Sequence, residues 1–132
     1  MYSRDVKSYQ EKYISTMTPS EMVTLLYSEI IKNLNKSIAA ISGKKIPEAH
    51  QHIVKAQDIL LYMIKNLDLR YEIGTELLKL YDFMYDALVK ANINKDAELI
   101  KRVLNMVTEL KATWIEAEKR SRAMSHDTVK CI

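Results

Sequence analysis

The chain has 132 residues, 48% of them apolar and 28% charged, with two glycines, two prolines and a net charge of +3. This length suits one domain that buries its own core, and the composition is too apolar for a disordered chain and too poor in turn residues for a β-sandwich. Its 20 basic and 17 acidic residues are interspersed. They predict a solvated surface, without the basic stripe that nucleic-acid binding requires.

The first predicted helix begins after residues 1–17, which show no sustained period. Thr18-Pro19-Ser20-Glu21 supplies a capping hydroxyl, a proline at the first helical position and a glutamate at the third. The helix ends at Ser42-Gly43. Its apolar residues form two adjoining faces, one of Met22, Leu26, Ile30, Leu34 and Ile38, the other of Val23, Tyr27 and Ile31.

Two further helices follow. Pro47 opens the second, which runs to about residues 66–69 and carries a near-heptad seam of Ala49, Ile53, Ala56, Leu60, Met63 and Leu67. The third begins between Tyr71 and Thr75 and ends at Asn92, a residue that takes the left-handed conformation readily. One side of the third helix carries Ile73, Leu77, Leu80, Met84, Leu88 and Ala91.

The fourth predicted helix is capped by Asn94, with Asp96 in its first turn, and fades near Met124. Its apolar residues are Ile100, Val103, Val107, Leu110, Trp114 and Ala117. Short connections between four helices predict an all-α fold, an antiparallel four-helix up-and-down bundle over residues 18–124. We expect residues 1–17 to form a mobile N-terminal segment and residues 125–132 to form a frayed tail.

No pattern for catalysis, a cofactor or a metal is visible. A di-metal bundle needs Glu-x-x-His pairs, and neither His50, His52 nor His126 has a glutamate three residues earlier. Cys131 lies in the expected tail with no base fixed beside it. There is also neither an apolar run long enough for a membrane span nor a signal-peptide core. We expect a cytoplasmic protein that is not an enzyme and binds no cofactor.

Large apolar side chains exceed what one core stripe needs. The surplus is either additional core or an exposed groove for a partner's amphipathic helix. Tyrosine, which accounts for eight of the ten aromatic residues, suits a surface that is alternately wet and covered. The surplus comprises Val23, Tyr27, Ile31, Ile59, Tyr62, Tyr85, Val89, Leu99 and Met106.

A series of short motifs follows in order along residues 6–117. The motifs are Tyr9-Gln10, Ile14–Glu21, Leu25–Tyr27, Lys55–Ile59, Leu80–Met84, Leu88–Asn92, Asn94, Asp96 and Trp114. In order and spacing they resemble the flagellin-specific export chaperones of the flagellar type III secretion system, the FliS family. The chain departs from that family where residues 69–73 lack the Glu-Lys-Gly-Gly of many members, and after Lys119.

The resemblance implies a monomer that binds the disordered C-terminal segment of flagellin one to one in apolar grooves, prevents its premature polymerisation and delivers it to the flagellar export gate. In that family the N-terminal region occupies groove space when cargo is absent, and an aliphatic-x-x-Tyr pattern, here Val6 and Tyr9, docks on the gate protein. We expect Trp114 to be a core anchor. The predicted cargo contacts are Tyr13, Ile14, Tyr27, Ile31, Tyr62, Tyr85 and Val89.

Two other functions remain open from the residues alone. One is a general helical adaptor whose cargo is unrelated to flagellin. The other is an RNA- or DNA-binding bundle that uses Lys44, Lys45 and the basic stretch of residues 119–122. Nucleic-acid binding would depend steeply on salt, whereas apolar cargo binding would give a negative heat-capacity change.

Overall fold

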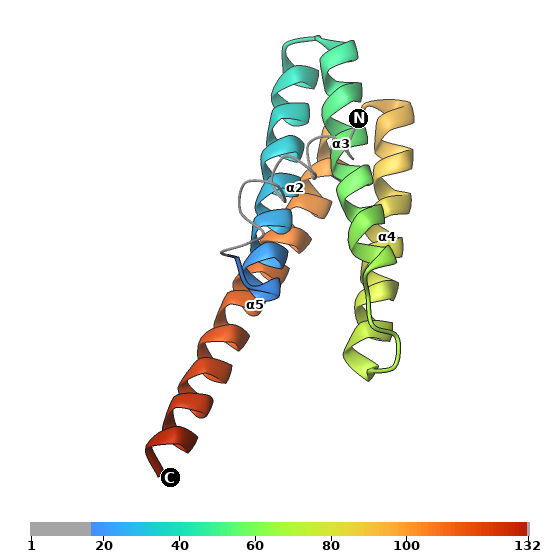
Figure 1. Cartoon of the computed structure of the whole chain (residues 1–132). Coiled ribbons are helices and arrows are strands. Elements are labelled where there is room, and N and C mark those ends of the chain that lie inside the picture. The colour runs from blue at the N-terminus through green and yellow to red at the C-terminus, as the bar shows by residue number, and fades with distance from the viewer. Residues whose placement is uncertain (1–16, 132) are drawn as a thin grey trace.

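The computed structural model describes the backbone of residues 17–131 and the side chains of residues 17–123. Its helices are α2 (Pro19–Ser42), α3 (Ile46–Lys65), α4 (Glu72–Asn94) and α5 (Ala97–Cys131). Figure 1 shows that they run alternately up and down, and that α5 extends beyond the other helices at its C-terminal end. The predicted all-α, antiparallel four-helix bundle is confirmed, although the helical backbone of α5 continues past the end expected near Met124.

The start of α2 follows the local chemistry of its sequence. Thr18 lies in the extended conformation, and its Oγ1 accepts a hydrogen bond from the backbone N–H of Glu21 at 3.1 Å. Pro19 occupies the first turn, where its missing N–H leaves no helical hydrogen bond unmade. This predicted helix start is confirmed, and it fixes where the chain enters the bundle.

The helices pack as a ring in which each has two neighbours. α2 packs against α3 and α5, and α4 packs against the same two helices, so α2 and α4 lie on a diagonal. α2 makes the more extensive contacts, and in Figure 1 the N-terminal half of α4 diverges from α2 and α5. The core between them includes Leu26, Ile30, Leu34, Ile53, Leu60, Met84, Leu88, Ile100, Val103 and Val107.

The junction between α4 and α5 differs from the prediction. α4 continues through Asn92 and Asn94, and Lys95 takes the left-handed conformation with φ 49°. Asp96 then caps α5, because its Oδ1 accepts a hydrogen bond from the backbone N–H of Leu99 at 3.2 Å. The predictions that Asn92 ends one helix and Asn94 caps the next were therefore wrong: a carboxylate two residues later caps the helix instead.

The core face of α4 is also rotated from the predicted one. Ile73 and Leu80 were expected on the buried side, yet they are 65% and 38% exposed. Tyr81 is buried in their place because its hydroxyl finds a partner inside the core. The buried residues of α4 are Gly74, Tyr81, Met84, Ala87, Leu88 and Ala91.

Within the part of the chain that the structure describes, no helix has the length and apolar character needed to cross a bilayer.

Candidate functional site

A cavity of about 410 Å³ opens where α4 diverges from α2 and α5. Its walls come from the start of α2, the end of α3, the 66–71 loop, the start of α4 and one residue of α5. The lining residues are Pro19, Met22, Val23, Leu26, Tyr62, Met63, Asn66, Leu67, Asp68, Tyr71, Ile73, Gly74, Leu77, Tyr81 and Trp114. Most of these side chains are aliphatic or aromatic, so the cavity suits apolar groups.

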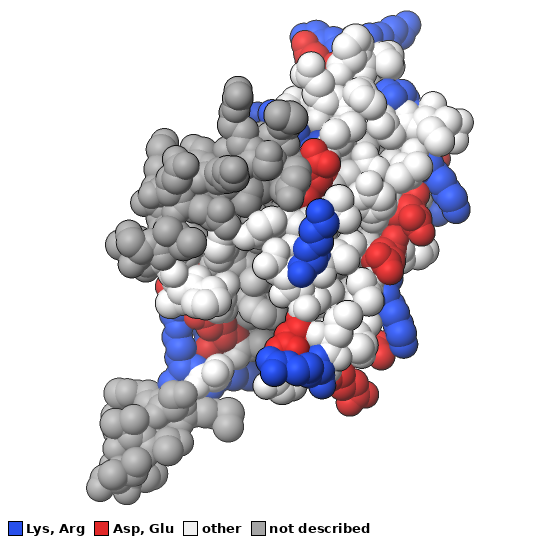
Figure 2. Space-filling view, turned by 45° about the vertical axis from the view of Figure 1, so that its right-hand side comes forward, with Lys and Arg blue, Asp and Glu red and all other residues white. Residues whose placement is uncertain are grey.

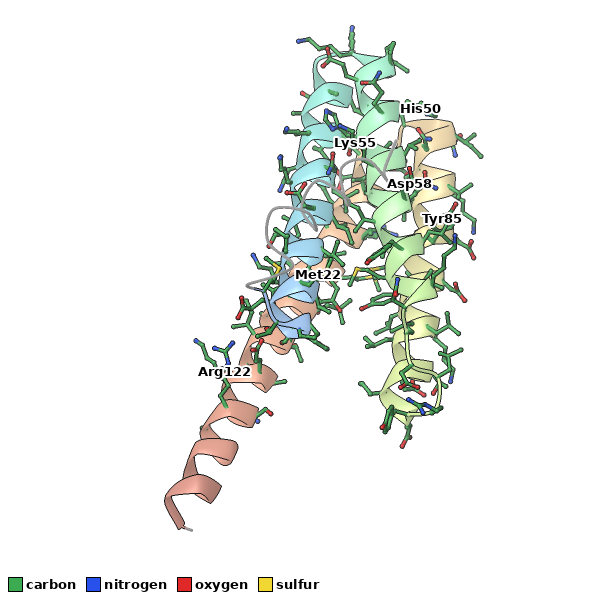
Figure 3. The ribbon with its side chains drawn as sticks, viewed as in Figure 1. Met22, His50, Lys55, Asp58, Tyr85 and Arg122 are labelled. Atoms are coloured by element: carbon green, nitrogen blue, oxygen red, sulfur yellow. The ribbon has the colours of Figure 1, made fainter. Side chains whose placement is uncertain are left out.

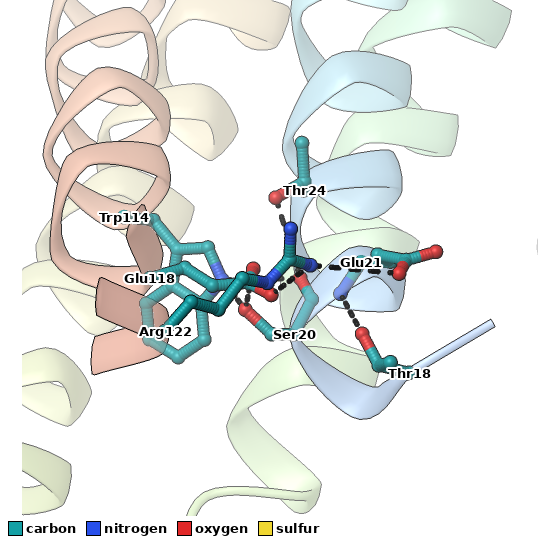
Figure 4. Close-up of polar contacts among 7 residues, drawn as sticks. All are labelled: Thr18, Ser20, Glu21, Thr24, Trp114, Glu118 and Arg122. Atoms are coloured by element: carbon teal, nitrogen blue, oxygen red, sulfur yellow. Dashed lines mark hydrogen bonds and ion pairs between the residues drawn. The ribbon is translucent and has the colours of Figure 1, made fainter. Parts of the chain in front are cut away.

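The α5 wall is held by polar contacts with the first turn of α2 (Figure 4). The indole Nε1 of Trp114 donates to the backbone oxygen of Ser20 at 3.1 Å and to its Oγ at 3.0 Å. The Ser20 hydroxyl donates to Glu118, and Arg122 pairs with both Glu118 and Glu21. These contacts fix the Trp114 ring between two helices, where it lines the cavity.

The 66–71 loop forms another wall and lies very close to α4. A Cβ atom added at Gly74 would sit 2.1 Å from the backbone oxygen of Asp68, so only glycine allows this approach. Asp68 also accepts hydrogen bonds from the backbone and guanidinium of Arg70. These bonds lower the pKa of the Asp68 carboxyl and hold the loop in a tight turn.

At the α4 side of the cavity, Tyr81 meets Tyr27 of α2. Their hydroxyl oxygens lie 2.5 Å apart and their rings pack edge to face. Burial raises the pKa of both phenols, because the charged form would lose its hydration inside the core. Both tyrosines are therefore neutral at physiological pH, and one hydroxyl donates to the other.

Charge around the site is mixed in sign. Figure 2 shows Lys, Arg, Asp and Glu side chains interspersed on one face, with broad uncharged areas between them. Several of the charged residues form ion pairs within one helix, as Lys79 does with Glu76 and Lys101 with Glu98. Among the described residues, no three His, Cys, Asp or Glu side chains gather as a metal site would require.

The predicted cargo contacts do not gather in one place. Tyr62 lines the cavity, whereas Tyr27 is 1% exposed and belongs to the core. Ile31 and Tyr85 are partly buried against the core, and Val89 is 37% exposed on α4. Figure 3 shows Tyr85 on α4, above the level of Met22, which lines the cavity on α2. Tyr13, Ile14, Val6 and Tyr9 lie outside the described residues.

The apolar surplus turns out to belong largely to the core and its margin. Tyr27 and Ile59 are buried. Partly buried positions packed against the core include Val23, Ile31, Tyr62, Tyr85, Leu99 and Met106. Val23 and Tyr62 also line the cavity. That this part of the surplus receives a partner's helix stays a prediction.

Comparison with known proteins identifies the family of the chain. The family model described as "Flagellar protein FliS" matches residues 2–121, nearly the whole chain. The chain belongs to the FliS family. The match includes every residue that lines the cavity.

Characterised FliS proteins resemble the chain along most of its length. The flagellar secretion chaperone FliS of Bacillus subtilis is 29% identical over 119 residues, covering 90% of both chains. FliSB of Pseudomonas aeruginosa is 30% identical over 121 residues, covering 86% of this chain and 96% of its own. FliS of Vibrio cholerae is 27% identical over 106 residues, covering 79% and 78%. The chain is thus a flagellar secretion chaperone, and FliS proteins are not enzymes.

Several cavity residues escaped the reasoning from sequence. Met22 and Leu77 were assigned to the core, and Trp114 was expected to be a core anchor. The structure makes Trp114 both an anchor, through Ser20, and part of the cavity wall. A signal was present, since Met22 lies three residues after Pro19 at a helix start, where a bundle has fewer neighbours to cover an apolar side chain.

Proposed function

We propose that this FliS protein binds the disordered C-terminal segment of flagellin, its cargo, in the apolar cavity and on the apolar surface beside it. Binding keeps the segment from polymerising before export. The observation that carries the proposal is the cavity itself, an aromatic- and aliphatic-lined hollow of about 410 Å³ on a protein of a chaperone family.

Exposed apolar side chains extend the surface beyond the cavity. Tyr71 and Ile73, at its rim, are 62% and 65% exposed. Phe83, further along α4, is 60% exposed. Contiguous exposed apolar surface marks interaction sites, and a disordered segment that folds on binding can cover more of it than a rigid partner. An amphipathic cargo helix would place its apolar side in the cavity and continue along α4.

The remaining parts of the proposal concern residues 1–16 and the setting. Tyr13 and Ile14 would cover the apolar surface until cargo displaces them, and Val6 and Tyr9 would dock the loaded chaperone on the export gate. Thr18 caps α2 directly before cavity residue Pro19, so residues 1–16 are joined to the bundle at the site. We place the protein in the cytoplasm, as a monomer that binds one flagellin.

Isothermal titration calorimetry of the full chain with a flagellin C-terminal peptide tests the proposal. We expect one-to-one binding with a negative heat-capacity change and little dependence on salt, because apolar burial drives it. Circular dichroism should show helix gained on mixing. No heat signal, together with a spectrum equal to the sum of the two components, would overturn the proposal.

Two matched variants locate the binding surface. Ile73→Gln removes an exposed isoleucine that lines the cavity. Ile93→Gln removes another isoleucine of α4, which is 76% exposed and does not line the cavity. Glutamine is uncharged and forms helices well, so neither replacement should disturb α4. We expect Ile73→Gln to weaken peptide binding about tenfold, the loss of ~1.4 kcal/mol of apolar burial, and Ile93→Gln to leave it unchanged. Equal effects would place the site elsewhere.

A further inference from the structure

Tyr27 and Tyr81 form a buried polar contact in a core that is otherwise mainly apolar. Their side chains are 1% and 2% exposed, and their hydroxyl oxygens are 2.5 Å apart. The ring centroids lie 6.4 Å apart with the planes at 69°, an edge-to-face arrangement. A hydrogen bond of this kind has a required distance and direction, unlike the aliphatic contacts around it.

The pair joins helices whose backbones do not come close to each other. α2 and α4 are diagonal in the bundle, and no Cα atom of one comes within 8 Å of a Cα atom of the other. The apolar contacts that fill this diagonal are non-directional and by themselves specify no single distance between two atoms. The hydroxyl contact between Tyr27 and Tyr81 fixes both the spacing and the register of the two helices.

The same pair borders the cavity. Tyr81 lines it from α4, and Leu26, which precedes Tyr27, lines it from α2. The distance between α2 and α4 therefore sets the width of the cavity. We propose that Tyr27 and Tyr81 are positioning residues for cargo binding, whose hydrogen bond holds α2 and α4 at the separation that admits a cargo helix. This inference rests on the proposed function of the cavity.

The physical consequence is a shift in population. With the hydrogen bond in place, most molecules have the cavity at its binding width. Without it, α2 and α4 sample several separations, and the apparent affinity falls with the fraction of molecules that remain competent. Loss of a hydrogen bond of ordinary net contribution reduces the competent fraction about fivefold.

The test compares Tyr27→Phe, Tyr81→Phe and the double variant in the full chain. Each single variant should lose stability in urea unfolding, because it leaves one buried hydroxyl without a partner. The double variant should recover part of that loss, since both hydroxyls are gone. Its affinity for the flagellin peptide should nevertheless stay about fivefold below that of the unmodified chain. A pair that only stabilised the fold would make affinity recover together with stability.

A second readout needs no cargo. Spin labels at exposed positions Asn35 on α2 and Lys79 on α4, with Cys131→Ser, report the separation of the two helices. The distance distribution should broaden when both tyrosines are replaced. Thr108→Val is the control, because it removes a hydroxyl whose hydrogen bond stays within α5, and it should change neither readout.

The outcomes separate the two claims. If the unmodified chain binds peptide and the double phenylalanine variant binds equally well, the positioning role is overturned. A label distribution that stays narrow in the double variant overturns it as well. If the unmodified chain does not bind the peptide, the proposed function fails, and the label distances alone then decide whether the tyrosine pair holds α2 and α4 in place.

Discussion

Replacing Gly74 by alanine should deform one wall of the cavity. The added Cβ would lie 2.1 Å from the backbone oxygen of Asp68 and 2.9 Å from its carbonyl carbon. Both contacts are with backbone atoms, so no side-chain rotation relieves them. Because hydrogen bonds between Asp68 and Arg70 hold the loop in its turn, the loop as a whole must move away from α4.

The magnitude follows from two opposing effects. Overpacking of this kind costs about 1 to 3 kcal/mol. Alanine recovers up to about 1 kcal/mol in the helix, since glycine is the poorer helix former. We expect Gly74→Ala to lower the free energy of unfolding by about 1 to 2 kcal/mol and the melting temperature by about 5 °C. Peptide binding should weaken several-fold, because the displaced loop carries cavity residues.

Gly43→Ala is the matched control. A Cβ atom at Gly43 would meet the Ala39 backbone oxygen at 3.5 Å, an ordinary contact, and its φ of −84° suits any residue. Urea unfolding of both variants, followed by circular dichroism, measures the difference. If Gly74→Ala proves as stable as Gly43→Ala, the close approach of the loop is not a real constraint and the reasoning fails.

Two further predictions concern the N-terminal segment and the tyrosine pair. Val6→Ala combined with Tyr9→Ala should spare peptide binding but weaken capture of the loaded chaperone by the export gate protein in a pull-down; loss of peptide binding with gate binding intact would reverse the two assignments. The pKa values of Tyr27 and Tyr81 are raised above the ordinary 10.0, so their contribution to stability is complete below pH 10 and is lost as the pH rises above it. Urea unfolding from about pH 8 to about pH 11 should therefore show a shallower alkaline loss when both are phenylalanine, and an unchanged slope would contradict this.

The sequence predicted features that depend on neighbouring residues, and it failed where distant packing decides. Thr18 caps α2 as expected because the capping hydroxyl and the N–H of Glu21 that donates to it lie three residues apart. At the junction between α4 and α5, several neighbouring residues could end one helix or cap the next. Lys95 adopts the left-handed conformation there, although asparagine favours that conformation more strongly by itself. Ile73 and Leu80 were assigned to the core because apolar residues on α4 span more than one face, so periodicity alone could not fix its rotation.

The cavity was harder to predict from the sequence than the helices were. Tyr62 was predicted as a contact and lines it, but the hollow also depends on the divergence of α4 and on the approach of the 66–71 loop to Gly74. The pattern of apolar and polar residues predicts neither the divergence of α4 nor the approach of this loop. The same limit explains Tyr27, a surplus aromatic by periodicity whose burial depends on a hydroxyl 54 positions away on Tyr81.

The hydrogen bonds between Ser20 and Trp114 connect residues 94 positions apart. During synthesis, α2, α3 and α4 leave the ribosome while the wall supplied by Trp114 is still missing, and so distant a contact forms late. A nascent chain therefore presents open apolar faces without a finished cavity. Under the proposed function, the cavity is therefore complete for cargo only after the Trp114 turn of α5 has folded onto Ser20 of α2.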